Sequence, residues 1–398
     1  MKPTLWLLPL EPLEERYTGQ WYKWLPETFS KAFEVVTLYS RALTKKVEVG
    51  AFLDLNSTAH YKAEQLRQVA ELFADGRVKS GDAFWVSDIE FWGIESIRYL
   101  ARLQGIRVYL FGFLHAASYT NEDFMAPMAD IGQYLEPAWI AAFDKVFVGS
   151  HYHRRKVIEQ RLTPLGFEAA QLAERLVVTG NPFRSKELVQ LAQESPFWKE
   201  GAGGVLDMGG QWPRRDINGI HVLFPHRPDH EKRPRRFLRL IEPLMAQAAA
   251  AGKKLNVAFT TGREKYRSTN DPRAVAQIGT LAAHGKVKLY ENLKRGDFYA
   301  LLARTQVVVS TAIEENFGYA MVEGMAMGAQ PLMPHDYSYP ELVKDERGFL
   351  YDGDEEFADS LNSLLLNGNL NVGRVRSYAA EFDGAEDRIL NAMLTAMD

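Results

Sequence analysis

Short apolar runs alternate with segments of helical character along the second half of the chain. These runs lie at residues 222–224, 255–260, 287–290, 307–310 and 330–333. Strands that are separated from one another by helices form a parallel sheet with helices on both of its faces. The sequence therefore predicts an α/β domain in this half.

In the first half of the chain, short apolar runs also alternate with segments of helical character. Its apolar runs lie at residues 4–8, 34–37, 84–86, 108–111, 146–148 and 177–178. A loop is expected at 9–19 and a helix at 61–73. A chain of 398 residues, 46% of them hydrophobic, is long enough to form two domains that each have their own core. We therefore expect a second α/β domain.

The composition excludes several classes of protein. The chain has no cysteine, so it forms neither disulfides nor a cysteine-ligated zinc site. No stretch approaches the ~18 consecutive apolar residues of a transmembrane helix. The first residues lack the long apolar run of a signal peptide. We expect a cytoplasmic protein that has no membrane partner.

Two carboxylates lie eight positions apart in the segment STAIEENFGYAMVEGMAMG, at residues 310–328. Glu315 lies in the loop after an expected strand, and Glu323 lies in the first turns of the helix expected at 319–327. Ligands of open α/β sheets bind at this edge. Carboxylates there are suited to accept hydrogen bonds from sugar hydroxyls. The alternative is a helix whose acidic residues face solvent, as we expect of Glu314.

Two cations follow the expected strand at 222–224. Arg227 and Lys232 lie in one loop, PHRPDHEK, before a helix that begins at about Pro234. A nucleoside diphosphate needs cations and helix N-terminal amides close to its oxygens. The alternative is an ordinary basic helix start at 232–236.

These two features resemble the retaining glycosyltransferases of the GT-B architecture. That family has a Glu-(seven residues)-Glu motif and an Arg and a Lys five positions apart after the first strand of its C-terminal domain. Pro225 and His226 stand where a glycine commonly precedes the arginine. The resemblance covers most of 223–361. It implies an α/β fold of two Rossmann-like domains that face each other across a cleft.

The resemblance also implies roles for individual residues. It implies that Glu315 meets the donor sugar, Glu323 the ribose of the nucleotide, and Arg227 and Lys232 the diphosphate. It implies that His115, in a loop of the N-terminal domain, contacts the donor sugar, although a structural histidine is the alternative. The predicted catalytic residues are His115, Glu315, Arg227 and Lys232. The further donor-binding residues are Gly19, Asn292, Leu293, Asn316, Phe317, Gly318 and Glu323.

The resemblance also divides the chain. It implies an acceptor domain at 1–183, a donor domain at 184–373, and a helix at about 374–398 that returns to the first domain. The region 185–219 is expected to be a linker with flexible glycines at 201–204 and 209–210. We expect a nucleotide sugar as co-substrate, with UDP the usual nucleotide, and neither a metal nor another cofactor, because no Asp-x-Asp sequence stands where a metal would bridge the diphosphate.

The acceptor site is expected in the N-terminal domain, where aromatic and basic residues gather. The candidate acceptor-binding residues are Trp21, Asp88, Glu90, Arg154, Arg155 and Lys156. Rings and cations together suit a base flipped from a duplex. The N-terminal half also resembles phage-encoded transferases, arabinosyltransferases among them, that glycosylate hydroxymethylated pyrimidines such as 5-hydroxymethylcytosine in DNA. Against this, the net charge is −4, and ordinary solvated helix faces explain basic runs equally well.

Three hypotheses follow. The first is a retaining glycosyltransferase that acts on modified phage DNA, in the cytoplasm of the host cell. The second is the same chemistry on a glycan, a lipid or a small metabolite. The third is a non-catalytic protein that binds sugar nucleotides or nucleic acid. The sequence fixes neither the sugar nor the oligomeric state.

Overall fold

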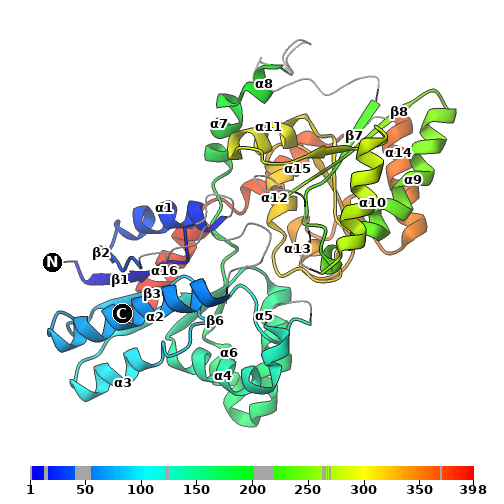
Figure 1. Cartoon of the computed structure of the whole chain (residues 1–398). Helices are drawn as coiled ribbons and strands as arrows, with labels where there is room; N and C mark the ends of the chain where they lie inside the picture. Colours follow the sequence, from blue (N-terminus) through cyan, green and yellow to red (C-terminus); the bar gives the residue numbers. More distant parts are fainter. Residues whose placement is uncertain are drawn as a thin grey trace. The chain divides into compact units, whose positions relative to one another are not determined.

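The computed structural model describes residues 2–12, 17–40, 55–121, 125–200, 219–261, 266, 268, 270–367 and 370–398. The chain forms two compact units. The first unit is Met1–Phe183 together with Gly384–Asp398, and the second unit is Arg184–Asp383. Each unit is built on a parallel sheet with helices on both faces (Figure 1). None of the described helices is both long enough and apolar enough to span a membrane.

The sheet of the first unit has the strand order β2-β1-β3-β4-β5-β6 among the described residues, and all its strands are parallel. The strands are β1 Thr4–Leu8, β2 Glu34–Thr37, β3 Ala83–Val86, β4 Tyr109–Phe113, β5 Lys145–Val148 and β6 Leu176–Val178. Central strands with both faces covered need apolar residues at consecutive positions. This explains why short continuous apolar runs were sufficient to predict them.

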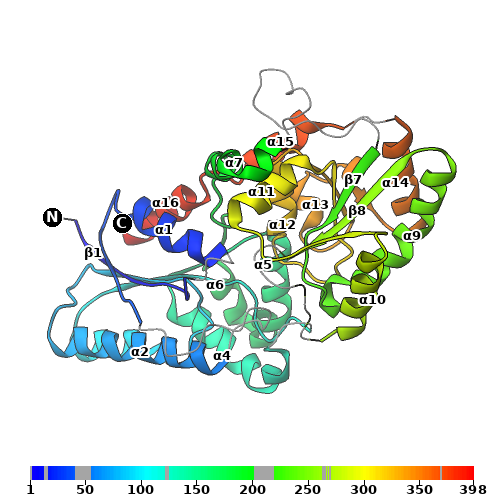
Figure 2. The same cartoon turned by 45° about the horizontal axis from the view of Figure 1, so that its top comes forward.

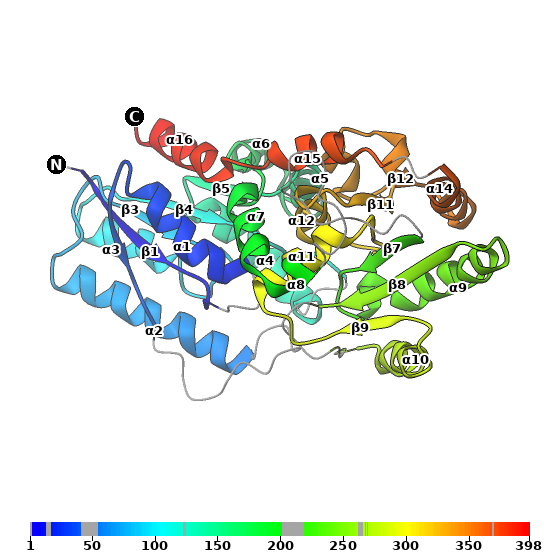
Figure 3. The ribbon, with the colours of Figure 1, turned by 90° about the horizontal axis from the view of Figure 1, so that it is seen from above.

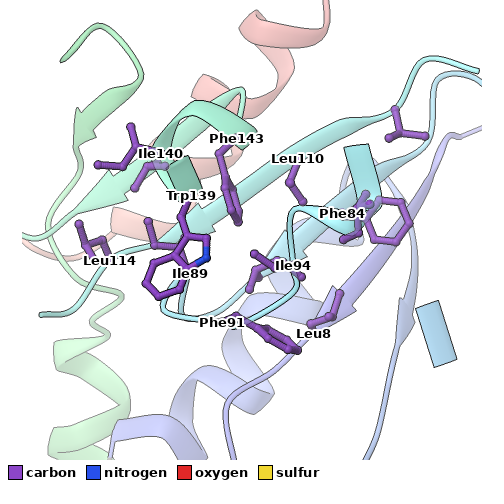
Figure 4. Packing of buried hydrophobic residues seen from close by; sticks show 14 of the residues in the cluster. Leu8, Phe84, Ile89, Phe91, Ile94, Leu110, Leu114, Trp139, Ile140 and Phe143 are labelled. Atoms are coloured by element: carbon purple, nitrogen blue, oxygen red, sulfur yellow. The ribbon is translucent and has the colours of Figure 1, made fainter. Parts of the chain in front are cut away.

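Helices cover both faces of this sheet. They are α1 Tyr17–Phe29, α2 Leu55–Ala74, α3 Ser96–Leu103, α4 Ala129–Ala142, α5 His151–Val157, α6 Ala169–Ala173 and α16 Ala385–Met397. On one face, Phe84 and Leu110 pack with Trp139 and Phe143 in a fully apolar cluster (Figure 4). On the other face, Trp85 lies 5.0 Å from the ring of Phe29 in α1.

The sheet of the second unit has the order β12-β11-β10-β7-β8-β9 among the described residues, again all parallel. Its neighbouring strands β7 and β8 lie side by side in Figure 2. The strands are β7 Gly219–Phe224, β8 Lys254–Thr260, β9 Lys288–Tyr290, β10 Val307–Val309, β11 Gln330–Pro334 and β12 Leu350–Tyr351. The chain builds outward from β7 in one direction and then returns to place β10 on its other side. Such a reversal is the point at which open α/β sheets bind ligands.

The helices of the second unit lie on both faces of its sheet (Figure 3). They are α7 Ser185–Glu194, α8 Pro196–Glu200, α9 Pro234–Ala250, α10 Pro272–Ala283, α11 Arg295–Arg304, α12 Tyr319–Ala326, α13 Tyr339–Leu342, α14 Asp354–Asn367 and α15 Val372–Ala380. Helix α9 begins at the predicted residue, and its proline at the first position has no amide hydrogen that needs a partner.

The expected linker at 185–219 is wrong in its first part. Residues 185–200 form helices α7 and α8, and α7 packs against α11 with Leu188 and Ala192 buried. The hydroxyl of Ser195 donates to Asp297 at 2.5 Å. The glycines at 201–204 and 209–210 lie outside the described residues.

Two further expectations differ from the structure. The expected single helix at 374–398 is two helices, because Gly384 between them has a left-handed backbone with φ 78°. Helix α15 packs against α12 in the second unit, and α16 contacts α1 in the first. The loop expected at 9–19 ends earlier, since α1 begins at Tyr17 and Gly19 lies in its first turn.

Candidate active site

The loops that follow β7 and β10 lie side by side in the second unit. Strands β7 and β10 pair in parallel, with Val222 opposite Val307, so both loops leave the same edge of the sheet. The hydroxyl of Thr311 donates to the carbonyl of Lys232 at 2.9 Å. The amide of Ile313 donates to the carbonyl of Glu231 at 2.9 Å. Backbone bonds therefore fix the two loops to each other.

An ion pair joins the predicted cation loop to the predicted acidic loop. Nζ of Lys232 lies 3.1 Å from Oε2 of Glu315, and the two side chains are only 15% and 19% exposed. Burial lowers the pKa of Lys232, but the carboxylates of Glu315 and Glu231 raise it more, so its pKa lies above the usual value. The lysine is therefore a permanent cation at neutral pH.

The other carboxylate oxygen of Glu315 caps helix α12. Oε1 accepts hydrogen bonds from the amides of Gly318 at 3.0 Å and Phe317 at 3.4 Å. A helix N-terminus leaves such amides without partners inside the helix and favours negative charge. One side chain thus ties a lysine on the β7 loop to the start of the helix after β10.

Gly318 allows this cap because of its backbone. Its φ is 93°, a left-handed conformation that residues with a Cβ seldom adopt. A Cβ at this position would also lie 3.1 Å from Cδ1 of Leu342 and 3.3 Å from Cε1 of Tyr339. The turn therefore favours glycine, and a Cβ at this position would make Leu342 or Tyr339 shift by a few tenths of an ångström.

Arg227 is held by two carboxylates. Its guanidinium lies 2.8 Å from Oδ2 of Asp229 and 3.1 Å from Oε1 of Glu231. The same Glu231 oxygen is 3.5 Å from Nζ of Lys232. Asp229 is buried and also accepts from Ser268 at 2.8 Å. The two predicted diphosphate-binding cations are thus parts of one charge network.

Glu323 has a different environment from the other three residues. Its Oε1 accepts a hydrogen bond from the hydroxyl of Tyr299 at 3.0 Å, and Tyr299 is buried in α11. Burial raises the pKa of Glu323 to about 7, against the opposing effects of Arg295 and of the Tyr299 hydrogen bond. The structure thus joins Lys232 directly to Glu315, connects Arg227 to Lys232 through the shared carboxylate of Glu231, and links Glu323 to helix α11.

The remaining donor-binding predictions fall at several places. Asn292 is exposed and left-handed, with φ 53°, and Leu293 beside it is buried. Phe317 is buried between the rings of Tyr319 and Phe382, at 5.0 and 5.2 Å. Asn316 lies in the turn between Glu315 and Gly318, which the hydrogen bond from the Gly318 amide to the Glu315 carboxylate closes. All of these roles remain predictions, as does that of Gly19 in α1.

His115 follows β4 in the first unit, and both of its ring nitrogens are engaged. Nε2 lies 2.8 Å from the carbonyl of Ser87, so it carries the proton and donates. Nδ1 lies 3.2 Å from the hydroxyl of Tyr17 and accepts from it. Burial lowers the pKa of His115 below its usual range, so the ring is neutral at pH 7. Its predicted contact with a donor sugar remains a prediction.

The candidate acceptor residues Trp21, Asp88 and Glu90 have partners within the first unit. Trp21 is buried, with its ring 4.8 Å from that of His115. Asp88 pairs with Lys62 at 3.2 Å and accepts from the amide of Glu90 at 3.3 Å. Glu90 is buried. Whether any of them contacts an acceptor stays a prediction.

Residues 154–156 do not form a continuous exposed basic surface, and their predicted contact with an acceptor stays a prediction. Arg154 donates to the carbonyls of Leu176 and Ala173, both at 3.0 Å. Lys156 is buried, with its ammonium 5.6 Å from the ring centre of Tyr119. Only Arg155 of the three is exposed.

The second basic run, at 233–236, is engaged with carboxylates. Arg235 pairs with Asp271 at 3.0 Å, and Arg236 pairs with Asp354 at 2.7 Å. These contacts reduce the charge that this second run offers to phosphates of a nucleic acid. Among the described residues, no group of three or more acidic or histidine side chains is arranged to hold a metal ion.

The sequence reasoning did not identify Asp229, Glu231 and Tyr299. Asp229 and Glu231 lie between the two predicted cations, where carboxylates at this spacing were a usable signal. Tyr299 lies four residues after Arg295, so both occupy one face of α11. Nothing in the sequence indicates that this face meets Glu323.

Comparison with protein families gives a match for the second unit. Residues 215–381 match the family described as glycosyl transferases group 1. A tRNA-queuosine alpha-mannosyltransferase from Drosophila melanogaster is 28% identical over 131 residues. That match covers 33% of this chain, and it covers about a third, 32%, of the length of the relative.

Solved structures resemble the whole chain. A trehalose 6-phosphate synthase from Burkholderia multivorans has a TM-score of 0.64 at 11% identity, and covers 100% of this chain and 98% of its own. Sucrose-phosphate synthase from Thermosynechococcus elongatus has a TM-score of 0.63 at 12% identity, covering 100% and 97%. Anabaena HepE, solved with UDP and glucose, has 0.62 at 16%, covering 99% and 100%. These likenesses confirm the predicted GT-B fold class.

Proposed function

We propose that this chain, whose residues 215–381 match the glycosyl transferases group 1, transfers a sugar from a nucleoside diphosphate sugar to a hydroxyl group, with retention of anomeric configuration. A UDP-sugar is the proposed donor, since a relative in fold was solved with UDP. The observation that carries the proposal is the network in which Arg227, Lys232 and Glu315 meet.

The cations suit a leaving diphosphate. As the bond between the sugar carbon and the phosphate oxygen breaks, negative charge grows on the diphosphate. Two partly buried cations stabilise that charge more strongly than water does, because their position is fixed before the reaction. Arg227 offers a planar fork of donors and Lys232 a compact ammonium. The backbone bonds between the loops hold both residues in place.

The carboxylate of Glu315 is suited to bind a hydroxyl of the donor sugar. Three of the hydrogen bonds to its carboxylate come from Lys232, Phe317 and Gly318. A carboxylate has about four lone-pair sites, so it can also accept from a sugar hydroxyl. Its fixed orientation favours one arrangement of the donor sugar over others.

Retention is proposed to proceed on one face of the sugar. The acceptor oxygen forms its bond to the anomeric carbon on the side from which the phosphate departs, and the departing phosphate oxygen takes the acceptor proton. Atoms and charge balance, since the products are the glycoside and the nucleoside diphosphate. The work of the protein is then to position the substrates and stabilise the diphosphate.

A donor panel tests this function. The full chain is incubated with UDP- and GDP-sugars, and release of the nucleoside diphosphate is measured with and without candidate acceptors. We expect turnover of at least one donor, and a loss of roughly hundredfold in Arg227→Ala and Glu315→Gln. The matched control is Asp354→Asn, which alters an arginine-paired carboxylate outside this network. Full activity in both site variants would refute the assignment of the site.

The acceptor is proposed to be a hydroxyl of a glycan or a small metabolite. A nucleic acid is the second candidate, since the Drosophila relative bears the name of an enzyme that acts on a tRNA nucleoside. The predicted hydroxymethylated DNA belongs to this second class. Bulk tRNA and duplex DNA containing 5-hydroxymethylcytosine are incubated with each donor, and their nucleosides are analysed by mass spectrometry. No gain of a sugar mass on either polymer would remove this candidate.

A further inference from the structure

We propose that the Glu231 carboxylate acts as an internal competitor of the diphosphate, occupying the cations in the absence of donor and leaving them when a nucleotide binds. This inference rests on the proposed function, because it concerns the same Arg227 and Lys232. It assigns to Glu231 control over donor affinity.

Glu231 is the carboxylate shared by the two cations. Its Oε1 lies 3.1 Å from a guanidinium nitrogen of Arg227 and 3.5 Å from Nζ of Lys232. One oxygen between two cations is the arrangement that a phosphate oxygen would adopt. The side chain of Glu231 is 16% exposed, so solvent weakens the contacts only partly.

Each cation keeps a second carboxylate if Glu231 departs. Lys232 retains Glu315 at 3.1 Å, and Arg227 retains Asp229 at 2.8 Å. These remaining partners hold the cations in position. The departure of Glu231 therefore frees charge for a ligand without releasing the two side chains that bind it.

The backbone of Glu231 is held in place by a contact between the two loops. Its carbonyl accepts from the amide of Ile313 at 2.9 Å, across the two loops. The residue lies in the short turn His230–Lys232, which precedes α9. Displacement then needs only a change of side-chain rotamer, which is a small cost compared with movement of a loop.

The charges explain how a nucleoside diphosphate can displace this side chain. A diphosphate offers several anionic oxygens and can contact both cations at once, whereas Glu231 supplies a single charge. The carboxylate must nevertheless be displaced, and that requirement weakens donor binding. Neutralising Glu231 while keeping its size should remove most of the competition.

The test is direct binding to the full chain. Titration calorimetry with UDP, GDP and inorganic pyrophosphate compares the wild type, Glu231→Gln and Asp354→Asn. We expect Glu231→Gln to bind the preferred nucleotide and pyrophosphate at least about threefold more tightly, since a carboxylate contact to a cation is replaced by a weaker amide contact. Asp354 pairs with Arg236 and Arg239, at 2.7 and 3.0 Å, so its amide variant is a matched control and should bind as the wild type does.

The outcomes separate this inference from the proposed function. Wild-type binding with equal or weaker binding by Glu231→Gln would overturn the competitor role and leave the proposed function standing. That result would mean that Glu231 only positions the cations. Binding of no phosphate ligand by any of the three proteins would overturn both. Thermal melting of each variant identifies any loss of folding, and Glu231→Ala, which removes the carboxylate altogether, should also bind more tightly.

Discussion

Nζ of Lys232 lies 3.1 Å from Oε2 of Glu315, and this contact joins the loop after β7 to the loop after β10. The same glutamate caps α12 through its other oxygen. Because the two strands are neighbours in the sheet but lie about eighty residues apart in the chain, one pair of side chains connects distant segments at the ligand-binding edge.

The coupling between these two residues can be measured. Lys232→Met leaves a partly buried carboxylate without its cation, and we expect it to lower the free energy of unfolding by about 1–3 kcal/mol. Glu315→Gln leaves the ammonium without that partner and should cost a similar amount. In the double variant the two losses should not add, with a coupling of about 1–2 kcal/mol. Urea unfolding of the four proteins gives this number, and strict additivity would contradict a direct interaction.

Gly318→Ala should destabilise the chain through both its backbone and its packing. We expect a loss of about 1–3 kcal/mol, because a left-handed φ disfavours alanine and the new Cβ meets Leu342 and Tyr339. Gly285→Ala is the matched control, since Gly285 also has a positive φ, 69°, but no atom within 4 Å of its Cβ position. Denaturant unfolding of the pair should show a larger loss at 318, and only that variant should weaken donor binding. Equal losses would mean that the contacts at 318 contribute nothing.

The strands could be predicted closely, and the side-chain partners could not. Thr4–Leu8 was predicted to the residue, because a buried parallel strand needs a continuous apolar run. The edge strand Glu34–Thr37, which is only partly buried, was also predicted to the residue. The meeting of the 227–232 loop with Glu315 followed from the rule that strand ends share an edge. The contact of Glu231 with both cations depends on rotamers, and the pairing of Glu323 with Tyr299 depends on how α11 packs. Neither leaves a local pattern in the sequence.

The basic run at 154–156 shows that a sequence can suggest more exposed charge than the folded chain has. A row of cations on a helix looks like a solvated surface when the rest of the fold is unseen. Long side chains also reach carbonyls and rings in neighbouring elements, as Arg154 does at Leu176 and Lys156 at Tyr119. Charge in a sequence therefore overestimates the charge that remains available to a nucleic acid.

Glu323 should make stability depend on pH. Its pKa in the folded chain is raised from 4.5 to about 7, so the folded state holds a proton that the unfolded state has lost between these values. The contribution of Glu323 to the free energy of unfolding is therefore fully present below pH 4.5 and is lost as the pH rises through 7. The total loss is about 3 kcal/mol. Glu323→Gln cannot ionise and should not show this loss.

Unfolding at a series of pH values between about 5 and 8 measures the difference between the wild type and Glu323→Gln. Tyr299→Phe is the companion variant, because the Tyr299 hydroxyl favours the charged carboxylate. Its removal should move the midpoint of the pH dependence to higher pH. A difference between wild type and Glu323→Gln that does not change with pH would show that the carboxyl titrates normally.

His153 should make the chain sensitive to acid. This histidine is buried in the first unit beside the hydroxyl of Tyr119, 2.5 Å away, and burial lowers its pKa from 6.5 to about 3. The unfolded state takes up a proton below pH 6.5, whereas the folded state does so only near pH 3. The contribution of His153 to the free energy of unfolding is thus fully present above pH 6.5 and falls as the solution is acidified. The loss is about 2 kcal/mol between pH 6.5 and 5.

The variant His153→Gln keeps a polar group that can bond to Tyr119 but cannot take up the proton. We expect it to be less stable than the wild type at pH 7.5, since the side chain fits less well, and to lose less stability on acidification. His284→Gln, at an exposed histidine that follows α10, is the matched control and should follow the wild-type curve. Chemical unfolding at about pH 7.5, 6.5 and 5 provides the comparison. Parallel curves for wild type and His153→Gln would mean that His153 takes up its proton at the same pH in the folded and the unfolded chain, and the lowered pKa would then be wrong.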